Sequence, residues 1–328
     1  MYHFCTLFDQ NYLPRARSLY ESLRACGTEF RLWALCMDAP SYEALRELRL
    51  PGVEPIALAD FEHADVELLT AKNDRSRAEY FFTCTPSLPL YVLEHWPEVD
   101  LITYLDADLF FFSHPQPIFE ELANASVGII AHRFSWLNQS RRRFGIYNVG
   151  WVSFRRDEDG LRCLRWWRER CIEWCYDRVE GNRYADQKYL DEWLERFRGV
   201  RAVEHKGANL APWNIANYQI RERDGRVMVD EDPLVFFHFQ GFQQIRPWLY
   251  NSNFGLYGVR PSSAVRRAVI GPYIRALQES TQAGVLRRGV RQASSYRGIV
   301  LRRLRRLVRL VLGVAAQEYV LVVRGRVL

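Results

Sequence analysis

Two aspartates that stand one residue apart in the apolar segment 101–112 are the strongest candidates for chemistry. Asp106 and Asp108 lie within a run rich in aromatic and β-branched residues, which is the composition of a buried strand. Burying two carboxylates is unfavourable unless a cation meets them, and carboxylate oxygens suit Mg²⁺ or Mn²⁺. We therefore expect a divalent metal at the carboxyl end of a strand, holding a diphosphate. The alternative for an isolated Asp-x-Asp is an Asx-turn or a surface ion pair.

Four further groups of polar residues lie at the ends of expected strands and helices. For three of them, an ordinary structural role would explain the residue types. His238 ends an apolar segment and, taken alone, is more often a hydrogen-bonded core histidine than a ligand. Asp186 and Gln187 stand at an expected helix start, where N-cap pairs are common. Asn148 and Gly150 fit turn chemistry. The fourth group, Asp9-Gln10-Asn11-Tyr12, follows the first expected strand.

The elements that must position these residues alternate between strands and helices. Strands are expected at Tyr2–Phe8, 30–37 and 52–58, separated by one helix that ends at Gly27 and one capped by Ser41. Later helices are expected over 85–95, 118–122, 161–176, 186–197 and 264–277, and later strands over 127–131 and 234–239. The segment 147–154 is apolar and contains Asn148 and Gly150. This order predicts an α/β fold with a mostly parallel central sheet. No Gly-x-Gly-x-x-Gly follows the first strand, so a dinucleotide fingerprint is absent.

Charge divides the chain near Pro261. The whole chain carries +6, and the part from Ser262 onward carries fourteen arginines and two glutamates, or +12, so residues 1–261 carry −6. We expect a catalytic domain over 1–261 and a basic helical tail over 262–328. Because the body is acidic, the high pI does not indicate a nucleic-acid partner.

Within the tail, apolar residues recur at helical spacing over 299–316, and arginines line another face. The apolar positions are Val300, Leu304, Leu307, Val308 and Val311, and the basic ones are Arg302, Arg305, Arg306 and Arg309. This pattern is typical of a helix lying on an anionic membrane surface. Docking of the tail on the acidic body and an RNA-binding arm are the alternatives.

The seven cysteines show no paired spacing, so we expect free thiols and a reducing compartment. The first residues run directly into a strand-like segment and do not resemble a signal peptide. No uncharged apolar stretch reaches the ~18 residues that a spanning helix needs. These observations predict a cytoplasmic protein, peripheral on the inner face of the cytoplasmic membrane.

In content and order, the five polar groups resemble the motifs of the family-eight retaining glycosyltransferases, which include bacterial lipopolysaccharide galactosyl- and glucosyltransferases and glycogenin. The resemblance spans about residues 1–250. It implies the Rossmann-like GT-A fold and transfer, with retention, of a sugar from a nucleotide-diphosphate donor, typically a UDP-sugar. It also implies a glycan or glycolipid acceptor and Mn²⁺ or Mg²⁺ as cofactor.

The resemblance implies a role for each polar residue. Asp106, Asp108 and His238 match the family's metal ligands. Asp186 matches a donor-sugar binder, and Gln187 matches the residue beneath the reacting anomeric carbon. Donor contacts are implied for Thr6, Asp9, Asn11 and Tyr12 near the nucleotide, Asn148 and Gly150 at the sugar and acceptor, and Gly241 and Arg246 at the diphosphate.

The chain departs from the family's pattern in three places. The segment that begins at His238 is two residues longer than the family's HxxGxxKPW and has Arg246 in place of lysine. The family's arginine on the helix before the Asp-x-Asp strand has no clear counterpart, so Arg75 or Arg77 is expected to substitute, or donor preference to differ. Trp213 lies where an acceptor-side loop is expected, and it is predicted to stack on a sugar.

Two other functions stay open from the sequence. A haloacid-dehalogenase-type phosphatase also has Asp-x-Asp after an apolar strand, but small residues and threonine follow its second aspartate, whereas Leu109-Phe110-Phe111 follows here. A non-catalytic protein whose tail binds membrane or RNA is the other alternative. The filled ligand positions argue against it.

Overall fold

The computed structural model describes residues 1–282, 319–323 and 326–327. Its centre is a seven-stranded sheet in the order β3-β2-β1-β4-β7-β6-β8. The strands are β1 (Tyr2–Phe8), β2 (Phe30–Cys36), β3 (Val53–Ala57), β4 (Leu101–Leu105), β6 (Val127–Ala131), β7 (Tyr147–Arg155) and β8 (Val200–Val203). All pairings in this sheet are parallel except those of β7, which runs antiparallel to β4 and β6. The mostly parallel α/β fold is therefore confirmed.

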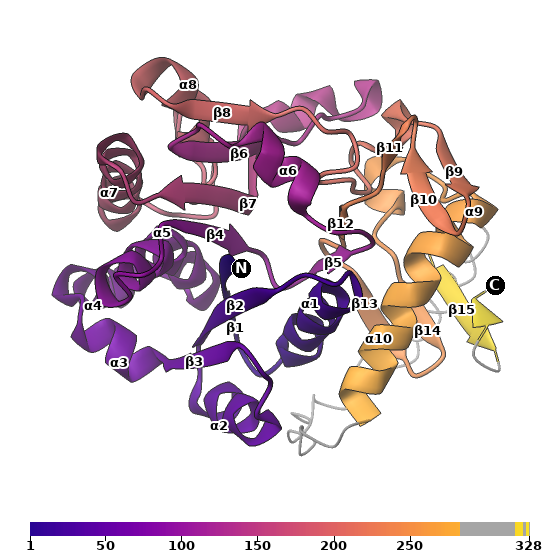
Figure 1. The fold of residues 1–328 in the computed structure, drawn as a ribbon, viewed down its shortest axis with the longest axis horizontal. Coiled ribbons are helices and arrows are strands. Elements are labelled where there is room, and N and C mark those ends of the chain that lie inside the picture. The colour runs from indigo at the N-terminus through magenta and orange to yellow at the C-terminus, as the bar shows by residue number, and fades with distance from the viewer. Residues whose placement is uncertain (283–318, 324–325, 328) are drawn as a thin grey trace, which may run out of the picture.

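Helices cover both faces of the sheet (Figure 1). The buried side chains of β1 alternate between these two faces. Cys5 and Leu7 pack with α5 (Arg77–His95) and α7 (Glu158–Glu173). Phe4 and Phe8 point to the other face, toward α1 (Leu13–Ala25). Smaller helices complete the layers: α2 (Ala39–Leu48), α3 (Leu58–His63), α4 (Val66–Ala71), α6 (Gln116–Glu121) and α8 (Trp193–Arg196). This period-two burial is what a central strand covered on both sides requires.

Short strands beside the main sheet bring distant parts of the chain to the Asp-x-Asp segment. β5 (Leu109–Phe111) pairs antiparallel with β12 (Phe236–His238), with Leu109 opposite His238. Two small sheets lie beyond them, formed by β9 (Ile220–Arg223), β10 (Arg226–Val229) and β11 (Asp232–Pro233), and by β13 (Gln243–Arg246), β14 (Leu249–Asn251), β15 (Tyr319–Val323) and β16 (Arg326–Val327). The β5–β12 pair is therefore the element that positions His238.

The described residues after Pro261 pack against the body. α9 (Ser263–Val265) leads through the π-helical turn η6 (Arg266–Ile270) into α10 (Gly271–Gln282), which lies beside α1 (Figure 1). β15 pairs with β14. The predicted tail helix over 299–316 lies outside the described residues, and the domain division at 261 stays a prediction. In the part of the chain that the structure describes, no helix is long and apolar enough to span a membrane.

Several elements differ from the sequence-based expectation. The expected helix over 85–95 begins at Arg77, where Ser76 and Glu79 form a capping box, and it contains Pro86 and Pro89. Asp38, and not Ser41, caps α2, because its carboxylate accepts from the Ser41 amide.

The expected helix over 186–197 is two short ones, η3 (Lys188–Glu192) and α8. The expected strand over 101–112 is broken at Asp106, after which β5 leaves the main sheet. All seven cysteines are free, as predicted.

Candidate active site

Asp106, Asp108 and His238, hereafter the Asp-Asp-His group, meet just past the carboxyl end of β4. The His238 Nε2 lies 3.5 Å from Asp106 Oδ2 and 3.1 Å from Asp108 Oδ1. One donor atom from each residue lies within 4.8 Å of the others, so the three could hold a single ion. Two carboxylates and one imidazole fit Mn²⁺ or Mg²⁺. The structure brings the three predicted ligands together, and their role as ligands stays a prediction.

A chain of hydrogen bonds behind His238 fixes its tautomer. The His238 Nδ1–H donates to Asn148 Oδ1 at 3.2 Å, so Nε2 is the nitrogen that faces the carboxylates. The Asn148 side-chain amide in turn donates to His132 Nε2 at 3.3 Å, and His132 Nδ1–H donates to the Ile146 carbonyl at 3.2 Å. Burial lowers the pKa of His132 to about 3, which keeps it neutral and able to accept. Outer-shell partners of this kind orient metal-binding histidines.

The charges of the Asp-Asp-His group are strongly interdependent. Burial raises the pKa of Asp108, but the His238 charge outweighs this, and the pKa of Asp108 falls below its ordinary value. Burial alone would lower the pKa of His238, whereas the neighbouring Asp108 raises it above the usual range. Burial raises the pKa of Asp106 to about 6, against the opposing charge of His238. A proton therefore sits among these groups at the position where a cation would be favourable.

Gly150 on β7 lies so close to the His238 ring that no side chain fits between them. A Cβ at this position would lie 2.8 Å from His238 Nδ1 and 2.6 Å from Asn148 Oδ1. The Gly150 amide also donates to the same Asn148 oxygen at 3.1 Å. Glycine is required here because the imidazole packs directly on the strand backbone.

Asp186 lies near Asp106, and the next residue, Gln187, lies beside Asn148. Asp186 is buried, and burial followed by the charge of Asp106 raises its pKa to about 7. The Gln187 amide donates to the Phe144 carbonyl at 2.9 Å, and its oxygen is 3.5 Å from Asn148 Nδ2. Asp186 therefore lies near Asp106, and Gln187 is linked to the Asp-Asp-His group through Asn148, which agrees with a shared site.

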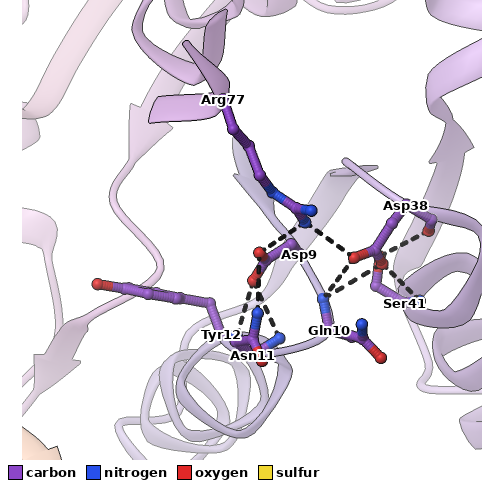
Figure 2. A network of polar contacts seen from close by, with 7 residues as sticks. All are labelled: Asp9, Gln10, Asn11, Tyr12, Asp38, Ser41 and Arg77. Carbon is purple, nitrogen blue, oxygen red and sulfur yellow. Dashed lines mark hydrogen bonds and ion pairs between the residues drawn. The ribbon is translucent and has the colours of Figure 1, made fainter. Parts of the chain in front are cut away.

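The turn after β1 forms a compact polar network (Figure 2). The Asp9 carboxylate accepts from the Asn11 backbone amide at 2.9 Å and from its side-chain amide at 3.1 Å. Arg77 bridges this turn to the start of α2, with its Nη2 2.8 Å from Asp9 Oδ2 and 3.1 Å from Asp38 Oδ2. The Tyr12 ring points away from the network and is partly exposed. Of the two arginines proposed to substitute for the family's arginine, Arg77 is the one that reaches this turn.

Arg75 and Thr6 have different surroundings from those predicted for a donor site. The Arg75 side chain is buried, donates to the Ile172 carbonyl at 3.1 Å and lies over the Tyr176 ring. Thr6 is buried on β1, and its hydroxyl has no hydrogen-bond partner among the described residues. Arg75 is therefore a structural residue, and the donor contact of Thr6 stays a prediction.

Gly241 and Arg246 lie on the loop and hairpin that follow His238. Gly241 has φ +73°, and a Cβ there would lie 2.3 Å from Asn253 Nδ2, so the turn needs glycine. Arg246 is exposed on β13, and among the described residues its guanidinium hydrogen-bonds only the Ile245 carbonyl, at 3.0 Å. The predicted phosphate contact of Arg246 is untested, and the structure shows no bond from it to the Asp-Asp-His group.

The prediction that Trp213 stacks on a sugar is wrong. Trp213 is buried, its Nε1 donates to the His132 carbonyl at 2.9 Å, and its ring meets the His238 ring edge-on with centroids 5.2 Å apart. It supports the imidazole from behind and presents no free face.

Sequence reasoning missed Arg15, on the first turn of α1. Its guanidinium lies over the Tyr12 ring, 4.2 Å from the centroid, and donates to the Phe242 carbonyl at 2.6 Å. Its charge is among those that lower the pKa of Asp108. Arg15 therefore stands between the turn after β1, the loop after β12 and the Asp-Asp-His group. The sequence contained one signal for Arg15, namely its position shortly after the polar group Asp9-Gln10-Asn11-Tyr12.

Comparisons with known proteins support the fold. No family model matches the sequence. The uncharacterized proteins YfnD and YfnF of Bacillus subtilis (strain 168) are 36% identical over 253 residues and 33% identical over 248 residues. The alignments cover 76% and 73% of this chain and 81% of each relative. The structure is also similar to that of the galactosyltransferase LgtC in complex with donor and acceptor sugar analogs, with a TM-score of 0.52 and 17% identity, over 87% of this chain and 100% of that one. This similarity shows a GT-A fold.

Proposed function

The chain belongs to the same family as YfnD and YfnF, and because its fold is that of a GT-A glycosyltransferase, we propose that it is a metal-dependent hexosyltransferase. In this proposal a sugar passes from a nucleotide-diphosphate donor, a UDP-sugar, to a glycan or glycolipid acceptor. Retention of the anomeric configuration follows from the family-eight resemblance. The observation that carries the proposal is the Asp-Asp-His group, with His238 Nε2 turned toward two carboxylates by Asn148.

The Asp-Asp-His group would hold Mn²⁺ or Mg²⁺, which when bound neutralises charge on the leaving diphosphate. Asn148 keeps the imidazole oriented, and Gly150 gives the ring room. Arg15 is placed to donate hydrogen bonds to phosphate oxygens, a geometry that guanidinium groups favour. Gly241 permits the turn that carries the Phe242 carbonyl to Arg15.

The donor's two ends would meet different parts of the site. Asp9, Asn11 and Tyr12 bind the nucleotide, and Arg77 holds the Asp9 carboxylate in place. Asp186 binds the donor sugar, and the Gln187 amide oxygen lies beneath the anomeric carbon, where it stabilises developing positive charge. An amide is a poor nucleophile, so the acceptor hydroxyl attacks from the face that the phosphate leaves, and the leaving phosphate takes its proton.

We also propose that the basic tail over 262–328 attaches the enzyme to an anionic membrane, where a lipid-linked acceptor would be reached. The support is the arginine-rich amphipathic pattern of the sequence over 299–316. Flotation with anionic vesicles tests this part separately, when the full-length protein is compared with a variant in which Arg302, Arg305, Arg306 and Arg309 are replaced by glutamine. This variant keeps α10 and β15, which pack against the body.

Hydrolysis of UDP-sugars with and without Mn²⁺ tests the catalytic proposal. Wild-type protein should release UDP only with the metal, and Asp108→Asn should lose this activity, because it removes a charge from a site suited to a cation. The matched control is Asp100→Asn. Asp100 is exposed and directly precedes β4, at the end opposite Asp106, so this variant should behave as wild type. Metal-independent hydrolysis of a UDP-sugar would contradict the metal site, and turnover of p-nitrophenyl phosphate without UDP-sugar hydrolysis would instead support a phosphatase.

A further inference from the structure

A surface beside the site combines exposed apolar side chains with arginines. The 3₁₀ helix η2 (Trp136–Phe144) exposes 79% of Trp136 and 48% of Leu137, and Leu256 nearby is 56% exposed. Arg142 and Arg143 follow on the same helix and are also exposed. We call these five residues the η2 patch. The nine residues of η2 contain three arginines and no acidic residue.

Helix geometry explains how both kinds of side chain reach the same surface. With three residues per turn, η2 has three faces, and one of them, formed by Asn138, Arg141 and Phe144, is turned inward. Asn138 is buried and its side-chain amide donates to the Tyr257 carbonyl at 3.1 Å. Each of the two remaining faces begins with an apolar residue and ends with an arginine: Trp136, Gln139 and Arg142 on one, and Leu137, Ser140 and Arg143 on the other.

The η2 patch is fixed to the edge of the site by its inward face. Arg141 donates to the Leu256 carbonyl at 3.0 Å and lies over the Tyr257 ring, which joins Leu256 to the patch. At the other end, the Phe144 carbonyl accepts from the Gln187 amide at 2.9 Å. A surface that η2 rests on would therefore lie next to Gln187.

We propose that the η2 patch rests on an anionic phospholipid surface. Tryptophan favours the boundary between hydrocarbon and water, because its ring is apolar and its N–H is polar. Arginines next to such residues contact lipid phosphates, and the absence of acidic residues from η2 leaves this charge uncompensated within the helix. The large exposure of Trp136 indicates a protruding side chain, which suits insertion into a lipid interface better than stacking of a sugar in a groove. This inference depends neither on sugar transfer nor on the basic tail.

Quenching by lipids brominated near the headgroup end of the acyl chain tests the contact directly in the full-length protein. Only Trp136 and Trp248 are strongly exposed among the ten tryptophans, so each can be replaced to isolate its signal. With vesicles of phosphatidylglycerol and phosphatidylcholine, we expect the wild type to be quenched. Trp136→Phe should lose most of this quenching, and Trp248→Phe should keep it. Equal quenching of Trp136→Phe and wild type, or no quenching of vesicle-bound wild type, would overturn the proposal.

Charge variants give an independent measurement. Arg142→Ala with Arg143→Ala should lower the partition coefficient on these vesicles about thirtyfold, since each arginine near an anionic surface contributes about fivefold. Arg221→Ala with Arg223→Ala removes the same charge from exposed positions on β9 and should change partitioning much less. Equal losses in the two pairs would contradict the proposal. So would a dimer in sedimentation that Trp136→Phe dissociates, because the patch would then be a contact between two copies.

Discussion

Gly150→Ala is the substitution that tests most directly how the fold holds His238. The added Cβ would lie 2.8 Å from His238 Nδ1 and Cε1 and 2.6 Å from Asn148 Oδ1, all closer than such contacts allow. Because both side chains are buried, relief requires moving the imidazole and breaking its 3.2 Å bond to Asn148. Overpacking of this kind costs about 1–3 kcal/mol of unfolding free energy. Loss of an outer-shell partner lowers metal affinity by about 10–100-fold.

The matched control is Gly128→Ala on β6, in the same sheet. Its Cβ would lie 2.5 Å and 2.8 Å from the two Leu122 Cδ atoms, so it also overpacks the protein, but against an apolar side chain away from the site. Urea unfolding without metal measures the stability loss, and titration with Mn²⁺ measures affinity. We expect both variants to lose stability and only Gly150→Ala to lose affinity. If Gly150→Ala binds Mn²⁺ as tightly as Gly128→Ala does, the imidazole is not held in the way we describe.

Four further predictions concern the same site. Arg77→Ala should raise the donor KM a few-fold with little change in kcat in a steady-state assay, because its guanidinium holds the nucleotide turn and is itself more than half exposed. Gln187→Ala should lower kcat more than it raises the donor KM, and a change confined to KM would mean that it binds only the ground state. Arg15→Ala should weaken UDP binding about tenfold or more by calorimetry and leave uridine binding unchanged, because a hydrogen bond to a charged group contributes about 1.5–3 kcal/mol. Mn²⁺ affinity should fall as pH drops through about 6, since the ion needs Asp106 deprotonated and must displace the proton on His238; calorimetry at several pH values that found a constant affinity would contradict this.

Much of the central sheet could be predicted from sequence, because strands buried on both faces are short apolar runs bounded by polar turns. The bounds of β1 and β6 agree with those expected. The aspartates were also expected at the carboxyl end of a strand, and Asp106 directly follows β4. What the apolar run could not reveal is the break after Leu105. Residues on both sides of it are equally hydrophobic, and only pairing with β12, more than a hundred residues later, draws β5 out of the main sheet.

The helix before β4 was misplaced for a local reason. Proline is favoured in the first turn of a helix, so Pro86 predicts a start at residue 85, but the helix begins eight residues earlier, at Arg77, and tolerates both prolines. The signal for the true start is present in the sequence as Ser76-Arg77-Ala78-Glu79, a capping-box pattern. Recognising it would have placed Arg77 at the first helical turn, next to the turn after β1.

Arg15 could not be found by following motif order, because its partner Phe242 lies 227 residues away. Motif order instead assigned the phosphate contact to Arg246, in a segment two residues longer than the family's pattern. In the structure that segment forms the antiparallel β13–β14 hairpin, which leaves Arg246 exposed. Arg15 reaches the start of the same segment from α1, with its charge close enough to lower the pKa of Asp108. The longer segment after His238 leaves Arg246 exposed, so another cation must contact the donor phosphate if that contact is kept. Arg15 on α1 is the guanidinium close enough to do so.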